Sequence, residues 1–187
     1  MERQKAPELR ELYLESKYIA KILKKILKSD SNCIDVGCHL GSFLSEMQRL
    51  APQGKHVGIE PIPHKAKWLQ KKFPNVNIHQ IAIGQSSNEV SFLENTKLSG
   101  LSHVRPLATS TTDTKNLNQI LVRMMPLDDI ISAGTKIDFL KVDTEGTELF
   151  VFQGAVSTIA RCKPVILFES TLNNLRNFNL TPDSIYN

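Results

Sequence analysis

Apolar residues recur along the chain in two alternating patterns, one at helical spacing and one as short continuous runs. Near the N-terminus, five apolar residues recur at helical spacing with lysines between them, and these are Ile19, Ile22, Leu23, Ile26 and Leu27. The spacing predicts an amphipathic helix. Runs that stop at glycine, proline or a carboxylate predict strands, and they cover residues 33–37, 56–60, 77–83, 89–93, 119–125, 136–142 and 164–169.

Helical spacing returns between these runs, at residues 43–50, 61–73, 127–131 and 147–152. Strands that alternate with helices predict right-handed βαβ units and a mainly parallel sheet with helices on both faces. We therefore expect a Rossmann-like α/β fold. Residues 94–118 are polar, rich in Ser and Thr, and without a clear period. They predict a long loop, of the kind that is usually functional or mobile.

The length of 187 residues fits one domain. We expect residues 1–30 to form a cover helix on the core, residues 31–170 the ligand-binding domain, and residues 171–187 a polar tail. The alternative for the first helix is a place on a membrane surface. No apolar run reaches the roughly 18 residues that span a bilayer, and no signal-peptide core follows the charged start. A soluble cytoplasmic protein without stable membrane insertion is expected.

The charge balance is mildly positive, with 23 Lys and Arg against 19 Asp and Glu. The excess lies in two lysine clusters, at residues 17–28 and 65–72, which we interpret as solvated helix faces. The sequence shows no basic stripe with interleaved aromatic residues and no RNA-binding motif, so no nucleic-acid partner is expected. Cys33, Cys38 and Cys162 form no CxxC pair and are expected to be reduced thiols in the packed interior.

Candidate chemistry gathers where the predicted strands end. Four of these ends carry a glycine or a carboxylate, and the residues are Asp35, Gly37, Gly41, Glu60, Asp143 and Glu169. In an open parallel sheet, ligands bind beyond the carboxyl ends of the strands. The residues therefore predict one shared binding site.

The segment after the first strand reads Asp35-x-Gly37-x-x-x-Gly41. Gly37 predicts a close approach of the backbone to a ligand, and Gly41 predicts close packing of the next helix near the sheet. Asp35 either orients the loop or accepts a hydrogen bond from a ligand amine. His39 stands where many nucleotide-binding folds have glycine, and histidine tolerates a left-handed backbone better than most residues.

Glu60 follows Gly37 by 23 positions (60 minus 37). A ribose-binding carboxylate is expected about 20 positions on. A nicotinamide cofactor is an alternative, but His39 and Ser42 occupy the second and third glycine positions of its G-x-G-x-x-G fingerprint. His39 would crowd a pyrophosphate. S-adenosylmethionine, which has a ribose and no phosphate, is therefore favoured.

With these features in place, the chain resembles the FkbM-type methyltransferases, a branch of the class I S-adenosylmethionine-dependent enzymes. The resemblance runs from about Asn32 to Glu169. It rests on several blocks, which are Ile34-Asp35-Val36-Gly37-x-x-x-Gly41, Gly58-Ile59-Glu60-Pro61, Ala82-Ile83-Gly84, Leu127-Asp128-Asp129-Ile130, Lys141-Val142-Asp143-Thr144-Glu145-Gly146-Thr147-Glu148 and Gln153-Gly154-Ala155. The block from Lys141 to Glu148 is the most specific.

The resemblance implies that residues 31–170 bind S-adenosylmethionine and transfer its methyl group to an oxygen of a sugar or another small metabolite. It also implies a role for each matching residue. The methionine part is framed by Asp35, Gly37, His39 and Gly41. Glu60 binds the ribose with Pro61 beside it, Ala82 and its neighbours line the adenine, and Asp143 lies near the cofactor amine or the acceptor. His39 departs from the small or amide residue expected at its position.

Methyl transfer to a neutral hydroxyl needs a base. Asp143 is the first candidate because it ends the central strand. His103, in the long polar segment, is the second, because imidazole titrates near neutral pH. Glu145 and Glu148 are expected to stabilise the N-terminus of the following helix, and Lys141 to be an ordinary strand residue.

Two further hypotheses change the picture little. Asp143 and Glu169 end adjacent strands and are a possible pair for a divalent cation, but the sequence offers no third ligand, so no metal is predicted. Residues 171–187 are too short for the helix and strand pair that usually complete a class I methyltransferase. A truncated, non-catalytic binding module is therefore the main alternative, and an NAD-dependent oxidoreductase a weaker one. The acceptor and the oligomeric state stay open.

Overall fold

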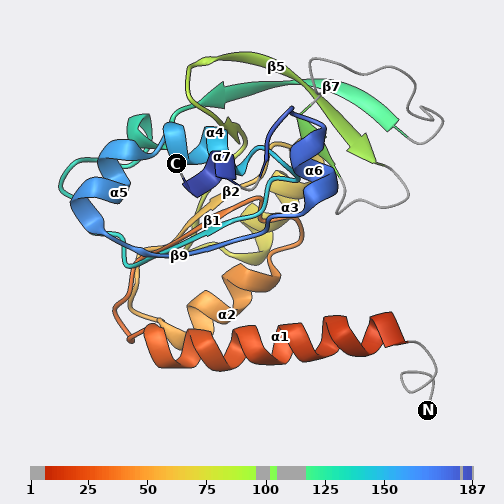
Figure 1. Ribbon diagram of the computed structural model, residues 1–187. Helices are drawn as coiled ribbons and strands as arrows, with labels where there is room; N and C mark the ends of the chain where they lie inside the picture. Colours follow the sequence, from red (N-terminus) through yellow and green to blue (C-terminus); the bar gives the residue numbers. More distant parts are fainter. Residues whose placement is uncertain (1–6, 96–101, 105–116, 182, 187) are drawn as a thin grey trace.

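The computed structural model describes residues 7–95, 102–104, 117–181 and 183–186 (Figure 1). Its centre is a five-stranded sheet in the order β3-β2-β1-β8-β9. The strands are β1 (Cys33–Val36), β2 (Val57–Ile59), β3 (Asn77–His79), β8 (Phe139–Val142) and β9 (Val165–Phe168). Every ladder in this sheet is parallel, which confirms the predicted α/β class.

Helices cover both faces of the parallel sheet. Three of them share one hydrophobic layer, and these are α1 (Pro7–Ile26), α2 (Ser42–Leu50) and α3 (Pro63–Lys72). The other layer contains α4 (Glu148–Gln153) and α5 (Val156–Cys162). Successive strand residues point to opposite faces, so Cys33 and Phe139 pack in the first layer, and Ile34 and Leu140 pack in the second.

The first helix packs on the core. In Figure 1, α1 lies along the outside of α2. Leu23 of α1 and Leu27, directly after the end of α1, are buried in one cluster with Leu44 and Met47 of α2, whereas the lysines between residues 17 and 28 are exposed. Among the described residues, no helix is long and apolar enough to cross a membrane.

Proline and left-handed residues set the helix ends. Gly41, with φ 76°, precedes α2. Pro63 stands in the first turn of α3, where its fixed φ suits a helix start. Lys163, with φ 48°, ends α5 directly before Pro164, because the residue before a proline avoids the helical conformation.

A second sheet in the order β4-β7-β5-β6 completes the fold. Its strands are β4 (Ala82–Ile83), β5 (Asn88–Asn95), β6 (His103–Val104) and β7 (Leu117–Met125). β4 pairs with β7 in parallel, and the other ladders are antiparallel. Figure 1 shows β5 and β7 arching together over one end of the molecule. The sequence predicted strands at the positions of β4, β5 and β7, but it did not predict that they form a second sheet.

Two predicted segments differ in the structure. The strand expected at 77–83 divides between the sheets, because β3 stops at His79, whose carbonyl accepts from the Glu60 N–H, and the chain then crosses to β4. The loop expected at 94–118 begins later, after β5 ends at Asn95, and contains β6. It ends where β7 begins at Leu117, and residues 96–101 and 105–116 lie outside the described residues.

Short helices also escaped prediction from the sequence. These are α5, α6 (Leu172–Arg176) and α7 (Asp183–Tyr186). The first turn of α5 is held by Asp128, whose carboxylate accepts hydrogen bonds from the Ser157 and Thr158 N–H groups at 2.8 Å each. A partner about 30 positions away leaves no local signal. All three cysteines are free, and Cys33 and Cys38 are buried as predicted, whereas Cys162 is half-buried.

Candidate functional site

A cavity of about 250 Å³ lies where β1, β2 and β8 end. Six of the predicted site residues line it, and they are Gly37, His39, Glu60, Pro61, Ala82 and Asp143. Asp35 and Gly41 do not line it. Phe92, Ser102 and Val104 of the second sheet and its margin form another part of the wall.

The backbone N–H groups of the loop after β1 donate hydrogen bonds within the protein. Four N–H groups have acceptors, and the pairs are Gly37 to the Ile59 carbonyl at 3.0 Å, Cys38 to the same carbonyl at 3.0 Å, His39 to the Glu60 carboxylate at 2.9 Å and Gly41 to the Cys38 carbonyl at 2.7 Å. Pyrophosphate sites at helix N-termini rely on free N–H groups. These four donors therefore do not serve a diphosphate.

Left-handed residues shape this loop. The φ angles are 78° at Gly37, 51° at His39 and 76° at Gly41, so the expected left-handed backbone at His39 is confirmed. A Cβ atom on Gly37 would collide with the Asp143 carbonyl oxygen. A Cβ on Gly41 would collide with the ring of Phe73, the residue that caps the C-terminus of α3. The prediction that Gly41 lets the helix approach the sheet is therefore wrong, since its close neighbour is another helix.

Glu60 is held in one orientation at the cavity wall. It is 3% exposed, and its carboxylate accepts hydrogen bonds from the N–H groups of His39 at 2.9 Å and Ile62 at 3.0 Å. Burial raises the pKa of Glu60, and these hydrogen bonds and the Lys65 ammonium oppose the rise. Each carboxylate oxygen can accept a second hydrogen bond, so Glu60 can still bind a ligand hydroxyl.

Lys65 also lines the cavity, so its prediction as part of a solvated lysine cluster is wrong. The side chain is buried, as are Ala66 and Leu69 on the same face of α3. Burial lowers the pKa of Lys65, and the carboxylates of Glu60 and Glu94 oppose this. Lys65 lies on the buried face of α3, whereas the rest of its cluster faces solvent.

Lys141 is not the ordinary strand residue that the sequence suggested. It is 5% exposed, and the β1–β8 register places it beside Asp35. Its Nζ forms ion pairs with Asp35 at 3.1 Å and Asp143 at 3.3 Å, and donates to the Gly37 carbonyl at 2.8 Å. Asp35 is fully buried. Its carboxylate does not line the cavity and pairs with Lys141, which in turn donates to the loop.

Glu148 builds the turn that follows β8. Its Oε1 accepts from the Thr144 N–H at 2.9 Å, the Thr144 hydroxyl at 3.0 Å and the Gly146 N–H at 3.2 Å. Within this turn Glu145 has a left-handed backbone, with φ 57°. Its carboxylate accepts from the Asn174 amide at 2.7 Å. Glu148 thus acts near the start of α4, as expected, whereas Glu145 lines the cavity instead.

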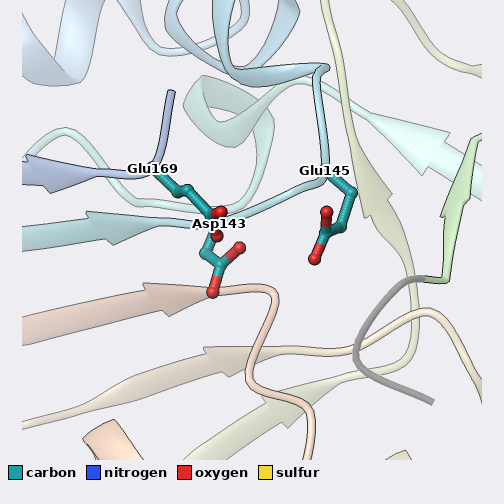
Figure 2. Close-up of side chains that lie close together, drawn as sticks. All are labelled: Asp143, Glu145 and Glu169. Atoms are coloured by element: carbon teal, nitrogen blue, oxygen red, sulfur yellow. The ribbon is translucent and has the colours of Figure 1, made fainter. Parts of the chain in front are cut away.

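Asp143, Glu145 and Glu169 converge at the ends of β8 and β9 (Figure 2). One oxygen of each carboxylate lies within 4.8 Å of the others. Burial, the hydrogen bond with Asp143 and the neighbouring carboxylates raise the pKa of Glu169 from 4.5 to about 8. The Lys141 ammonium beside Asp143 offsets part of the negative charge of this cluster. Glu145 supplies the third carboxylate that the sequence did not reveal, but the cluster alone identifies no metal, and we assign none.

His103 is not brought to the cavity. It lies in β6, opposite Leu93 of β5, between Ser102 and Val104, which both line the cavity. Because successive residues of an extended chain point to opposite sides, the imidazole is directed away from that space.

Four site features escaped prediction from the sequence, and these are Lys65, Lys141, the inward place of Glu145, and Asn174. A signal existed for Lys141, because it interrupts the apolar run of β8, and a buried ammonium needs carboxylate partners. No signal existed for Asn174, which lies in a polar segment without periodicity.

The comparisons with known proteins identify a family and a similar fold. Residues 35–184 match the methyltransferase FkbM domain family. The fold is similar to the crystal structure of methyltransferase FkbM from Methylobacillus flagellatus KT, with a TM-score of 0.56 and 18% identity over 81% of this chain and 35% of that chain. The chain thus spans about a third of that structure's length.

Two further structures have lower similarity. Precorrin-6y C5,15-methyltransferase from Geobacter metallireducens GS-15 has a TM-score of 0.47 and 14% identity over 85% of this chain and 65% of that one. A TehB-like SAM-dependent methyltransferase from Corynebacterium glutamicum has a TM-score of 0.45 and 11% identity over 97% and 81%. Neither similarity is strong enough to assign a function. No curated protein matches.

The family match spans the loop after β1, the residues around the cavity, the acidic turn after β8 and α6. The Methylobacillus flagellatus structure, which has the same family name, shares the fold. The chain therefore belongs to the FkbM family of methyltransferases.

Proposed function

We propose that this chain is an S-adenosylmethionine-dependent methyltransferase that methylates a hydroxyl oxygen of a sugar or another small metabolite. The observation that carries the proposal is the cavity at the strand ends, where Gly37, Glu60 and Asp143 face one space. Membership of a methyltransferase family indicates the type of reaction, and the cavity is the proposed binding site.

The groups around the cavity suit an adenosine with an amino-acid tail. Apolar side chains for an adenine ring come from Ile81, Ala82 and Ile83. Glu60 offers carboxylate oxygens to the ribose hydroxyls, and Asp143 offers them to an ammonium group. The cavity is close to the lower end of small-molecule sites, roughly 300 Å³.

The same geometry disfavours a nicotinamide dinucleotide. The N–H groups of Gly37, Cys38, His39 and Gly41 already donate within the protein. A pyrophosphate would have to compete for them with the Ile59 and Cys38 carbonyls and the Glu60 carboxylate. S-adenosylmethionine makes no such demand, because it carries no phosphate.

The protein's part in catalysis is to hold the acceptor and receive its proton. S-adenosylmethionine, when bound, supplies a methyl group made electrophilic by its sulfonium. A hydroxyl loses its proton as its oxygen attacks. The proposed receiver is one carboxylate oxygen of Asp143, while the other oxygen accepts from the cofactor ammonium. Glu145 is a second carboxylate at the cavity wall. His103 has no role here, because it does not line the cavity.

The acidic cluster also supports a small-molecule acceptor. Asp143, Glu145 and Glu169 lie together at this end of the sheet. Like charges repel a polyphosphate backbone, and nucleic-acid binding depends on cationic contacts. A sugar hydroxyl is neutral and can donate hydrogen bonds to carboxylates.

Calorimetric titration tests the cofactor. Purified chain is titrated with S-adenosylhomocysteine, S-adenosylmethionine and NAD, beside Glu60→Ala and the exposed control Glu89→Ala on β5. We expect both adenosyl ligands to bind and NAD not to bind. Glu60→Ala should weaken binding about 10-fold or more, the effect of a lost hydrogen bond to a charged group, while Glu89→Ala stays within about 2-fold. A folded chain that binds NAD in preference would overturn the proposal.

Methyl transfer separates the enzyme from the non-catalytic module. The chain is incubated with methyl-labelled S-adenosylmethionine and a panel of monosaccharides and nucleotide sugars. We expect label on a hydroxyl of at least one of them, and Asp143→Asn should reduce that transfer by about 100-fold, a common general-base contribution. Cofactor binding without transfer to any acceptor would support the non-catalytic module.

A further inference from the structure

Lys141 is a fully engaged ammonium beneath the cavity. An ammonium has three N–H donors, and three acceptors surround this one, namely the Gly37 carbonyl at 2.8 Å, Asp35 at 3.1 Å and Asp143 at 3.3 Å. The ring of Phe43 in α2 covers it, with its centroid 5.3 Å from Nζ. Lys141 does not line the cavity. All three N–H donors of Lys141 have acceptors within the protein. Lys141 therefore affects ligand binding only through the residues that it contacts.

The two carboxylates around Lys141 have different surroundings. Asp35 is fully buried, whereas the Asp143 side chain is 35% exposed. Burial raises the pKa of Asp35, and Lys141 opposes the rise. Burial also disfavours the charge on Lys141, but Asp35 and Asp143 raise its pKa above the ordinary value. Lys141 therefore compensates the buried carboxylate and leaves Asp143 as the one that faces the cavity.

Lys141 also joins the two strand ends. Its partners Gly37 and Asp143 both line the cavity, and they are in close contact, because no Cβ fits between Gly37 and the Asp143 carbonyl. The Asp143 N–H donates to the Val36 carbonyl at 3.1 Å. Loss of the ammonium would release both the Gly37 carbonyl and the Asp143 side chain from their common partner.

Glu60 and Asp143 serve different parts of the cavity. Glu60 follows β2 and Asp143 follows β8, with β1 between them in the sheet. Two strand spacings separate them by about 10 Å. A ligand with a ribose at one end and an α-amino acid at the other can meet Glu60 and Asp143 separately.

We propose that Lys141 is a positioning residue for the amino-acid part of the cofactor. It holds the Gly37 carbonyl and the Asp143 carboxylate where they accept hydrogen bonds from the ligand ammonium. This inference rests on the proposed S-adenosylmethionine site. It assigns Asp35 an indirect role, as the buried counter-ion that keeps Lys141 charged.

Two ligands test this inference without knowledge of the methyl acceptor. S-adenosylhomocysteine carries the amino-acid part, and 5′-methylthioadenosine lacks it. Both are titrated calorimetrically into wild type, Lys141→Met, the double variant D35N/K141M and Glu60→Gln. The double variant removes both buried charges, so it keeps the test open if Lys141→Met alone fails to fold. Thermal unfolding confirms that each variant is folded.

We expect Lys141→Met and the double variant to weaken S-adenosylhomocysteine about 10-fold or more and methylthioadenosine by less than about 2-fold. Glu60→Gln should weaken both ligands alike, because both contain the ribose. Equal weakening of both ligands by the lysine variants, or weakening of neither, would overturn the positioning role. A folded wild type that binds neither ligand would instead refute the cofactor site itself, and the inference with it.

Discussion

The side-chain amide of Asn174 donates a 2.7 Å hydrogen bond to the carboxylate of Glu145. Asn174 lies in α6, beyond the last strand of the parallel sheet, and Glu145 lies in the turn after β8. A Cβ on Gly146 would come within 2.6 Å of the Asn174 carbonyl, so α6 packs tightly on this turn. Residues expected to be a plain tail therefore hold a carboxylate of the candidate site.

Asn174→Ala should destabilise the protein by about 1 kcal/mol, since it removes a hydrogen bond to a half-buried charged group. The measurement is urea denaturation at neutral pH. The adjacent, exposed Asn173 provides a matched control, and Asn173→Ala should change the stability by less than about 0.5 kcal/mol. Equal midpoints for both variants would show that the contact contributes nothing.

Glu148→Ala should cost about 3 kcal/mol of unfolding free energy, because one buried carboxylate oxygen accepts three hydrogen bonds from the 144–146 turn. Glu148→Gln keeps a carbonyl acceptor and should lose roughly half as much. Chemical denaturation of the two variants gives the comparison. If both variants are as stable as wild type, Glu148 does not hold the turn.

Glu169 should make the protein less stable as the pH rises. Its pKa is raised in the folded state from 4.5 to about 8, so between these values the folded state binds more protons than the unfolded state. The unfolding free energy therefore falls as the pH rises through that window. Glu169→Gln removes this contribution, so its stability should decline less than that of wild type between about pH 5 and about pH 8.

Denaturation series at several pH values, with a chelator present to exclude a bound cation, measure this difference. Asp35, Glu60 and Glu145 also have raised pKa values, so the comparison between wild type and variant isolates Glu169. Parallel curves for the two proteins would contradict the raised pKa.

Gly37→Ala should destabilise the protein by about 3 kcal/mol or more. The φ of 78° is unfavourable for alanine, and the new methyl would collide with the Asp143 carbonyl. Gly134 has no atom within 4 Å of an added Cβ, so Gly134→Ala is the matched control and should be nearly neutral. Thermal unfolding of both variants tests this, and similar losses would show that the strand ends are not in close contact.

The sequence predicted correctly those cavity residues that come directly after a strand of the parallel sheet. Gly37, Glu60 and Asp143 each directly follow a short, mainly apolar strand, and parallel strands bring such ends to one edge. These three residues line the cavity.

The sequence did not predict contacts between segments that are far apart along the chain and that show no periodic pattern of apolar residues. Lys65 and Lys67 look alike in the sequence, and only the rotation of α3 buries the first. Asp128 stabilises α5 from about 30 positions away. Asn174 lies in a polar stretch, and its partner Glu145 reaches it through a left-handed turn that Glu148 holds.

The most direct test of the account is a titration of ¹⁵N-labelled chain with S-adenosylhomocysteine, followed by amide chemical shifts. The account predicts the largest shifts at Gly37, Glu60, Ala82 and Asp143, around the cavity, and negligible shifts at the exposed residue Val156 in α5. Shifts centred elsewhere, or none at saturating ligand from a folded chain, would contradict the proposed cofactor site.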